Sequence, residues 1–181
     1  MILLIFQAIK KVKKFCKNII LNSPMNKIKL TNLDIPEIKN FQCNRHPVLF
    51  LDKVIEVTPG KSAIGKKNFS YNEWFFPPHF EDDPNVPGFI QVETLVQTFI
   101  MTFLTLDDFK GMKTNFISID NVKFKRKIIP GDTLIIKSEL NSFKRGIAKG
   151  SSSGYINDDI ACSADFIVSL PDVLNSFKPK N

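Results

Sequence analysis

The feature that most limits the possible folds is an unbroken apolar run, residues 89–106, which reads "FIQVETLVQTFIMTFLTL". It contains no Gly, Pro, Lys or Arg, and apolar residues would fall on every face of a helix. Such a helix has to be surrounded by protein, and the run is too long for a typical strand. Pro87 and Gly88 suit its first turn. The sequence therefore predicts a long buried central helix that begins at Gly88.

Strand-like segments precede and follow this helix. Residues 48–70 alternate apolar and polar side chains on both sides of Pro59-Gly60, which predicts a hairpin. Residues 71–88 contain four prolines, which predicts an irregular but anchored loop. Three alternating segments follow the helix, the last divided by the turn residues 157–159: 115–128, 133–146 and 147–170. Strands around one helix, without regular βαβ alternation, predict an α+β fold with a mostly antiparallel sheet.

The net charge of +7 is concentrated near the N-terminus. Five lysines fall between Lys10 and Lys17, and residues 1–24 contain no acid, so the rest of the chain is nearly balanced. No basic stripe with interleaved aromatic residues occurs there, which argues against a nucleic-acid partner. Three interpretations of residues 1–22 stay open: a basic amphipathic helix in weak contact with an anionic membrane surface, a docking helix, or leader sequence before a start at Met25.

The cysteines Cys16, Cys43 and Cys162 are isolated and odd in number. They form neither a disulfide framework nor a zinc pattern, so we expect a reducing, cytoplasmic compartment and no metal. No apolar run reaches the ~20 residues needed to span a bilayer. We predict a basic extension and connector over residues 1–40 and one folded domain over residues 41–175.

The stretch 78–97, "PHFEDDPNVPGFIQVETLVQ", brings together groups that suit proton transfer. His79 is one of two histidines in the chain, and an imidazole has a reference pKa of about 6.5. Glu93 and Gln97 lie four residues apart, so the amide can orient the carboxylate on one helix face. The free N–H of Gly88 at the helix start suits an oxyanion. A base, an acid and an oxyanion site together favour proton abstraction next to a carbonyl.

These residues alone do not decide between a catalytic and a purely structural role for Glu93 and Gln97. The two side chains can satisfy each other in the core without any catalytic role. Against this, a carboxylate inside an apolar helix costs several kcal/mol unless it is paired, and no Lys or Arg lies in that helix.

Residues 47–170 resemble the hotdog-fold 3-hydroxyacyl-[acyl-carrier-protein] dehydratases of type II fatty acid synthesis. The resemblance runs in order through "HPVLFLDKVIEVTPGKSAIGKKN", "NEWFFPPHF", "DPNVPGFIQVETLVQ" and "IDNVKFKRKIIPGD". It implies an antiparallel sheet wrapped around a long central helix over residues 41–175, a homodimer with a trimer of dimers as the larger alternative, and no cofactor. The implied partner is an acyl carrier protein carrying a phosphopantetheine thioester.

The resemblance also implies a role for each site residue. His79 removes the α-proton, and Glu93, held by Gln97, protonates the departing β-hydroxyl. The Gly88 N–H polarises the thioester carbonyl, and the His and the acid of one site come from different protomers. Two neighbouring residues are expected to contact the substrate: Phe80 and Pro87.

The chain departs from the family pattern around His79. The family usually has Gly before the His and Pro after His-Phe, where this chain has Pro78 and Glu81. We expect the acidic residues 81–83 to form a solvated loop, and these changes leave acyl length and pathway open. Two alternatives to a dehydratase remain: a thioesterase, or a non-catalytic protein that binds acyl thioesters. The basic residues 123–127 suit either a solvated strand face or a surface that steers an acidic carrier.

Overall fold

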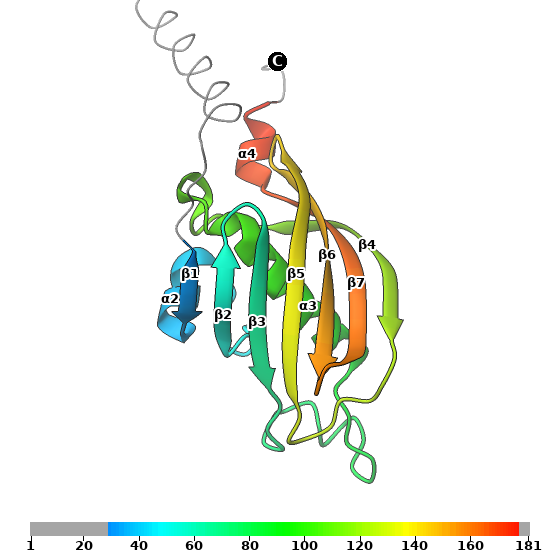
Figure 1. The fold of residues 1–181 in the computed structure, drawn as a ribbon. Helices are drawn as coiled ribbons and strands as arrows, with labels where there is room; N and C mark the ends of the chain where they lie inside the picture. Colours follow the sequence, from blue (N-terminus) through cyan, green and yellow to red (C-terminus); the bar gives the residue numbers. More distant parts are fainter. Residues whose placement is uncertain (1–28, 178–181) are drawn as a thin grey trace, which may run out of the picture.

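A computed structural model describes residues 29–177 of the chain (Figure 1). The elements follow in the order β1 (Leu30–Leu33), α2 (Ile35–Phe41), β2 (Lys53–Thr58), β3 (Ser62–Asn68), α3 (Gly88–Leu104), the 3-10 helix η1 (Asp107–Phe109), β4 (Asn115–Phe124), β5 (Thr133–Lys144), β6 (Ile147–Ile156), β7 (Asp159–Ser169) and α4 (Pro171–Asn175). The residues of the predicted membrane-contacting extension, 1–22, lie outside the described part. No helix between residues 29 and 177 is long and apolar enough to cross a membrane.

The strands form one seven-stranded sheet in the order β1-β2-β3-β5-β6-β7-β4, and every neighbouring pair is antiparallel. The predicted hairpins are present: β2 and β3 meet at Pro59-Gly60, and β6 and β7 meet at Asn157-Asp158. Gly60 has a φ of 75°, a conformation that glycine adopts without steric cost. The α+β prediction is therefore confirmed.

The central helix α3 lies against one face of the curved sheet (Figure 1). Thirteen of its residues are buried, from Ile90 to Leu104, so the predicted buried helix is confirmed. Its buried threonines are satisfied within the helix: the hydroxyl of Thr94 donates to the Ile90 carbonyl and that of Thr102 to the Phe99 carbonyl, each at 2.7 Å. Local bonding of this kind lets hydroxyls occupy a core position without an unsatisfied donor.

Glycines let the sheet approach α3 closely. A Cβ added at Gly65 of β3 would lie 2.3 Å from the Thr98 hydroxyl oxygen. One added at Gly150 of β6 would lie 2.4 Å from the Phe99 ring and 2.0 Å from the carbonyl oxygen of Glu139. Both distances are well inside van der Waals contact, so larger residues here would push the helix away from the sheet.

The sequence predicts a connector that ends at residue 40. In the structure, residues 30–41 instead form β1 and α2, and β1 extends the sheet. β1 pairs antiparallel with β2 through Leu30↔Val57 and Leu33↔Val54. α2 starts after Asp34, whose N–H donates to the Glu37 carboxylate at 2.8 Å. Both elements are too short to show a hydrophobic period, which is why the pattern did not reveal them.

Strand β4 is one edge of the sheet and pairs only with β7 among the described strands. Almost its whole length is exposed in the single chain. Its exposed apolar side chains are Phe116, Ile117, Ile119, Val122 and Phe124. An exposed apolar edge of this length marks a contact surface rather than a solvated strand.

Candidate active site

His79 lies in the loop between β3 and α3, and a succession of turns holds it there. Backbone hydrogen bonds of 3.0–3.2 Å close these turns, each N–H donating to the carbonyl three residues earlier, at Glu73, Phe76 and His79. Phe75 and Phe76 are fully buried beneath the loop. The predicted anchored loop is therefore confirmed.

The hydrogen bonds of the His79 ring decide which nitrogen can act as a base. Its Nδ1 lies 3.0 Å from the carbonyl oxygen of Asn85, and the Asn85 N–H donates back to the His79 carbonyl at 3.0 Å. A carbonyl only accepts, so Nδ1 carries the proton and Nε2 keeps its lone pair. The ring also stacks on Phe80, with centroids 4.5 Å apart. This tautomer and orientation suit a general base.

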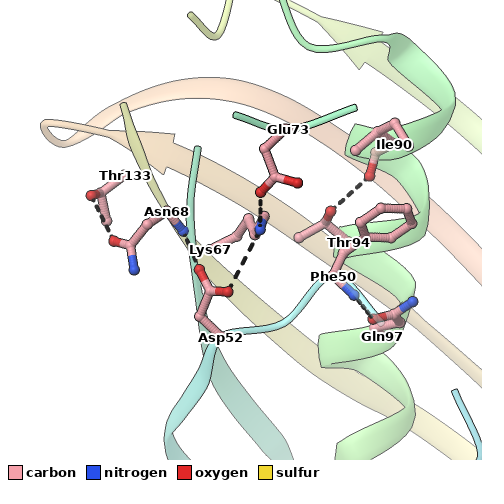
Figure 2. Close-up of polar contacts among 9 residues, drawn as sticks. All are labelled: Phe50, Asp52, Lys67, Asn68, Glu73, Ile90, Thr94, Gln97 and Thr133. Atoms are coloured by element: carbon pink, nitrogen blue, oxygen red, sulfur yellow. Dashed lines mark hydrogen bonds and ion pairs between the residues drawn. The ribbon is translucent and has the colours of Figure 1, made fainter. Parts of the chain in front are cut away.

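Glu93 is held by two amides. Gln97 Nε2 donates to Glu93 Oε1 at 2.8 Å, as the four-residue spacing predicts, and Asn44 Nδ2 donates to the same oxygen at 3.3 Å. Gln97 is itself fixed, because its Oε1 accepts the Phe50 N–H at 2.9 Å (Figure 2) and its Nε2 also reaches the Val48 carbonyl. The segment 48–50 thus orients Gln97, and Gln97 orients Glu93. The sequence did not indicate Asn44, because nothing local links it to a residue 49 positions away.

Burial raises the pKa of Glu93, and the hydrogen bonds from Gln97 and Asn44 oppose this rise only in part. No Lys or Arg forms a salt bridge with Glu93 among residues 29–177. The protonated form is therefore favoured more than in an exposed glutamate. A carboxyl group in this state is suited to donating a proton.

Replacing Glu93 by glutamine is expected to raise the free energy of unfolding at about pH 8 and to change it little near about pH 4. Because the pKa of Glu93 is raised in the folded state, the stability contributed by the protonated carboxyl is present at low pH. It is lost as the pH rises through the folded-state pKa. Glutamine does not titrate, and its oxygen can accept the same two hydrogen bonds.

Urea unfolding at fixed protein concentration across this pH range measures the difference. Glu81→Gln, at an exposed position, is the matched control. An equal effect of Glu93→Gln at both ends of the range would contradict the raised pKa.

Gly88, Pro87 and Phe80 are residues for which the resemblance predicts contact with the substrate. Gly88 opens α3, and no hydrogen bond from its N–H is present among residues 29–177. A Cβ added there would lie 2.9 Å from the Phe124 ring, so glycine leaves room for that ring beside the helix start. Pro87 is the buried N-cap residue, and the Phe80 side chain is 53% exposed. A free N–H at the positive end of a long helix suits an oxyanion.

Glu93 lies between two cavities, and His79 lines neither of them. The smaller, about 320 Å³, is bounded by Asn44, Val96 and Ile100 among others. The larger, about 750 Å³, is bounded mainly by apolar residues, including Val92. Neither of these two cavities therefore brings the expected base and acid together.

The acidic residues 81–83 are all exposed, so the solvated loop expected for them is confirmed. Asp83 forms an ion pair with Lys127, which ties this loop to the segment after β4. His46, the other histidine, is exposed and far along the chain from the loop of His79.

A protein-family model and curated relatives each match most of the chain. The FabA-like domain model matches residues 43–165. The chain is 35% identical over 143 residues to the 3-hydroxyacyl-[acyl-carrier-protein] dehydratase FabZ of Syntrophomonas wolfei, covering 79% of this chain and 99% of that protein. It is 40% identical over 140 residues to the FabZ of Bacillus cereus, covering 77% and 97%.

Solved structures share the fold at low sequence identity. The dehydratase heterocomplex ApeI:P from Xenorhabdus doucetiae matches with a TM-score of 0.64 at 13% identity, over 74% of this chain and 90% of that one. An uncharacterized protein from Pyrococcus horikoshii matches with a TM-score of 0.59 at 10% identity, over 78% and 95%. These likenesses confirm the predicted hotdog fold.

Proposed function

The chain belongs to the FabA-like family of 3-hydroxyacyl-[acyl-carrier-protein] dehydratases, and we propose that His79 and Glu93 are the base and the acid of its reaction. The enzyme converts a 3-hydroxyacyl thioester on the carrier protein into the trans-2-enoyl thioester and water, in fatty acid or specialised acyl-chain synthesis. The observation that carries the assignment is Glu93, a half-buried carboxyl with raised pKa that two amides hold in place.

The proposed mechanism follows from the geometry of each group. Nε2 of His79, free because Nδ1 donates to Asn85, takes the proton from the α-carbon. The charge that develops on the thioester oxygen is stabilised by the Gly88 N–H, a donor of the kind whose removal typically costs about 3–4 kcal/mol of barrier. Glu93 gives its proton to the β-hydroxyl, which leaves as water while the double bond forms. Proton return from His79 to Glu93 through solvent completes the cycle.

A homodimer is the assembly that we propose, because Glu93 lines both cavities described above and His79 lines neither. The exposed apolar edge strand β4 lies beside both parts of the site: Phe124 reaches Gly88, and Phe116 and Ile119 line the larger cavity next to Glu93. Pairing of two β4 edges would cover these side chains and bring His79 of one protomer toward Glu93 of the other. A trimer of dimers and a cytoplasmic location stay predictions.

Ile119→Asp is expected to weaken dimer formation by at least about tenfold in Kd, because a charge would be buried in an apolar contact. Sedimentation velocity over a concentration series measures the change. Ile35→Asp, at a similarly exposed isoleucine that starts α2, is the matched control and should leave the dimer intact. Equal Kd values for wild type and Ile119→Asp would place the interface elsewhere.

The carrier protein is the proposed partner, and the basic segment 123–127 is the proposed steering surface. Its basic side chains are all exposed: Lys123 within β4, and Lys125, Arg126 and Lys127 directly after it. Carrier proteins are acidic, so this arrangement favours encounter at low salt.

A direct assay tests the function as a whole. Turnover of 3-hydroxyacyl-carrier protein by the dehydratase raises the enoyl-thioester absorbance and releases no free thiol. Thiol release without enoyl formation would indicate a thioesterase, and no reaction at several acyl lengths would indicate a non-catalytic binding protein.

A further inference from the structure

Lys67 occupies an unusual position for a lysine. In β3 the buried residues alternate with partly exposed ones, and Lys67 falls on the same inward-facing side as Ala63 and Gly65. Its relative exposure is 6%, whereas its neighbour Lys66 on the other face is half-buried. A lysine is almost never buried to this degree without a partner. The sheet therefore holds a positive charge on its core side, close to the loop that carries His79.

Two carboxylates compensate this charge, and Figure 2 shows the ammonium group between them. Lys67 Nζ lies 2.5 Å from Glu73 Oε1 and 3.5 Å from Asp52 Oδ1. Asp52 is fixed to the same strand, because its Oδ2 accepts the Asn68 N–H at 2.6 Å. Glu73, in contrast, belongs to the loop between β3 and α3. The ion pair between Lys67 and Glu73 is thus a link between the sheet and that loop.

The link continues from Glu73 to the imidazole through the backbone. The Glu73 carbonyl accepts the Phe76 N–H at 3.2 Å, and the Phe76 carbonyl accepts the His79 N–H at 3.0 Å. Two consecutive turns therefore connect Glu73, whose carboxylate is held by Lys67, to the backbone of His79. A shift of Glu73 would be transmitted to the point where the Nδ1 hydrogen bond to Asn85 is made.

Energetics favour a role in geometry over a role in stability. A buried ion pair contributes little net stability relative to well-packed apolar residues, because desolvation offsets the Coulombic attraction. Burial of Phe75 and Phe76 already holds the loop on the core, but apolar contact has no preferred direction. A short charge-assisted hydrogen bond does have one.

We propose that Lys67 is a positioning residue of the active site: through its ion pair with Glu73 it fixes the loop in the orientation that His79 needs as a base. This inference deepens the proposed function and rests on the assignment of His79. Lys67 itself does not touch the reacting atoms.

Lys67→Met and Glu73→Gln test the proposal, with Lys66→Met as the matched control on the opposite face of β3. Each of the two test variants is expected to lower kcat by about 10- to 100-fold, because small displacements of a catalytic group have effects of this size, with KM changed less than about twofold. The double variant should be no slower than the slower single one, since both changes remove the same ion pair. Lys66→Met should retain wild-type kcat.

A second measurement does not depend on activity. The chain has only two histidines, so the imidazole nitrogens of His79 can be followed by NMR with His46 as an internal reference. Wild type should show His79 protonated at Nδ1, and Lys67→Met and Glu73→Gln should show mixed tautomers while His46 is unchanged. If wild type proved inactive, the proposed function would fail, and this measurement would still test the positioning.

Unchanged kcat together with an unchanged His79 signal in folded Lys67→Met would overturn the proposal, even if its Tm were lower. Should Lys67→Met fail to fold, Glu73→Gln carries the same test, because Glu73 is more exposed and keeps an acceptor oxygen as glutamine. Normal kcat and a normal His79 signal in that variant would equally overturn it.

Discussion

Replacing His79 by alanine is expected to lower kcat for dehydration by about 10²- to 10⁴-fold, the usual contribution of a positioned general base. The carboxylates nearest to it in the sequence, at 81–83, are all exposed and Asp83 is paired with Lys127, so we expect none of them to substitute for it. KM should change little, because the imidazole acts on the α-proton and contributes little to binding of the acyl chain. Enoyl-thioester absorbance with 3-hydroxyacyl-carrier protein measures the loss.

The chain provides its own control for this substitution. His46→Ala removes the only other histidine, which is exposed and lies outside the site, and should leave kcat within about twofold. Glu93→Gln should lose activity to a similar extent as His79→Ala, because glutamine cannot supply the proton to the leaving hydroxyl. Turnover by His79→Ala at the wild-type rate would remove His79 from the mechanism.

Mixing the two inactive variants, His79→Ala and Glu93→Gln, is expected to restore activity to about a quarter of the wild-type level. If each site combines His79 of one protomer with Glu93 of the other, a mixed dimer contains one intact site and one that lacks both groups. Random exchange makes about half of the dimers mixed, and half of their sites are intact. Among residues 29–177, Glu93 lines both cavities described above and His79 lines neither, which is the reason to expect recovery.

The control for the mixing experiment is a chain with both substitutions. Mixed with His79→Ala, it forms dimers in which no site has both groups, so no activity should return. Exchange is verified with differently tagged protomers isolated by sequential affinity steps. If isolated mixed dimers of the two single variants have no activity, each site is built within one protomer.

The local part of the candidate site could be predicted from the sequence. Gln97 meets Glu93 because residues four apart share a helix face, and the helix itself follows from an apolar run without Gly or Pro. The prolines around His79 likewise predict an anchored loop. These inferences depend only on residues that are close together in the sequence.

The distant part could not be predicted from pattern alone. Asn44 reaches Glu93 across 49 positions, and Phe50 orients Gln97 across 47. Lys67 appears as an ordinary strand lysine until the strand's inward face is known. These three features leave no periodic pattern or fixed spacing in the sequence, because each depends on how separate elements pack.

The sequence by itself determined the element types: the buried helix that begins at Gly88, the hairpins on either side, and a candidate base, acid and oxyanion donor in fixed order. Hydrophobic period and turn residues are local properties, so they can be read along the chain. Only the tertiary structure decided that β3 pairs with β5, and that β4 pairs with β7 and forms an exposed edge of the sheet. That placement depends on which long-range pairings bury most apolar surface around α3, and it leaves the apolar side chains of β4 exposed in the single chain.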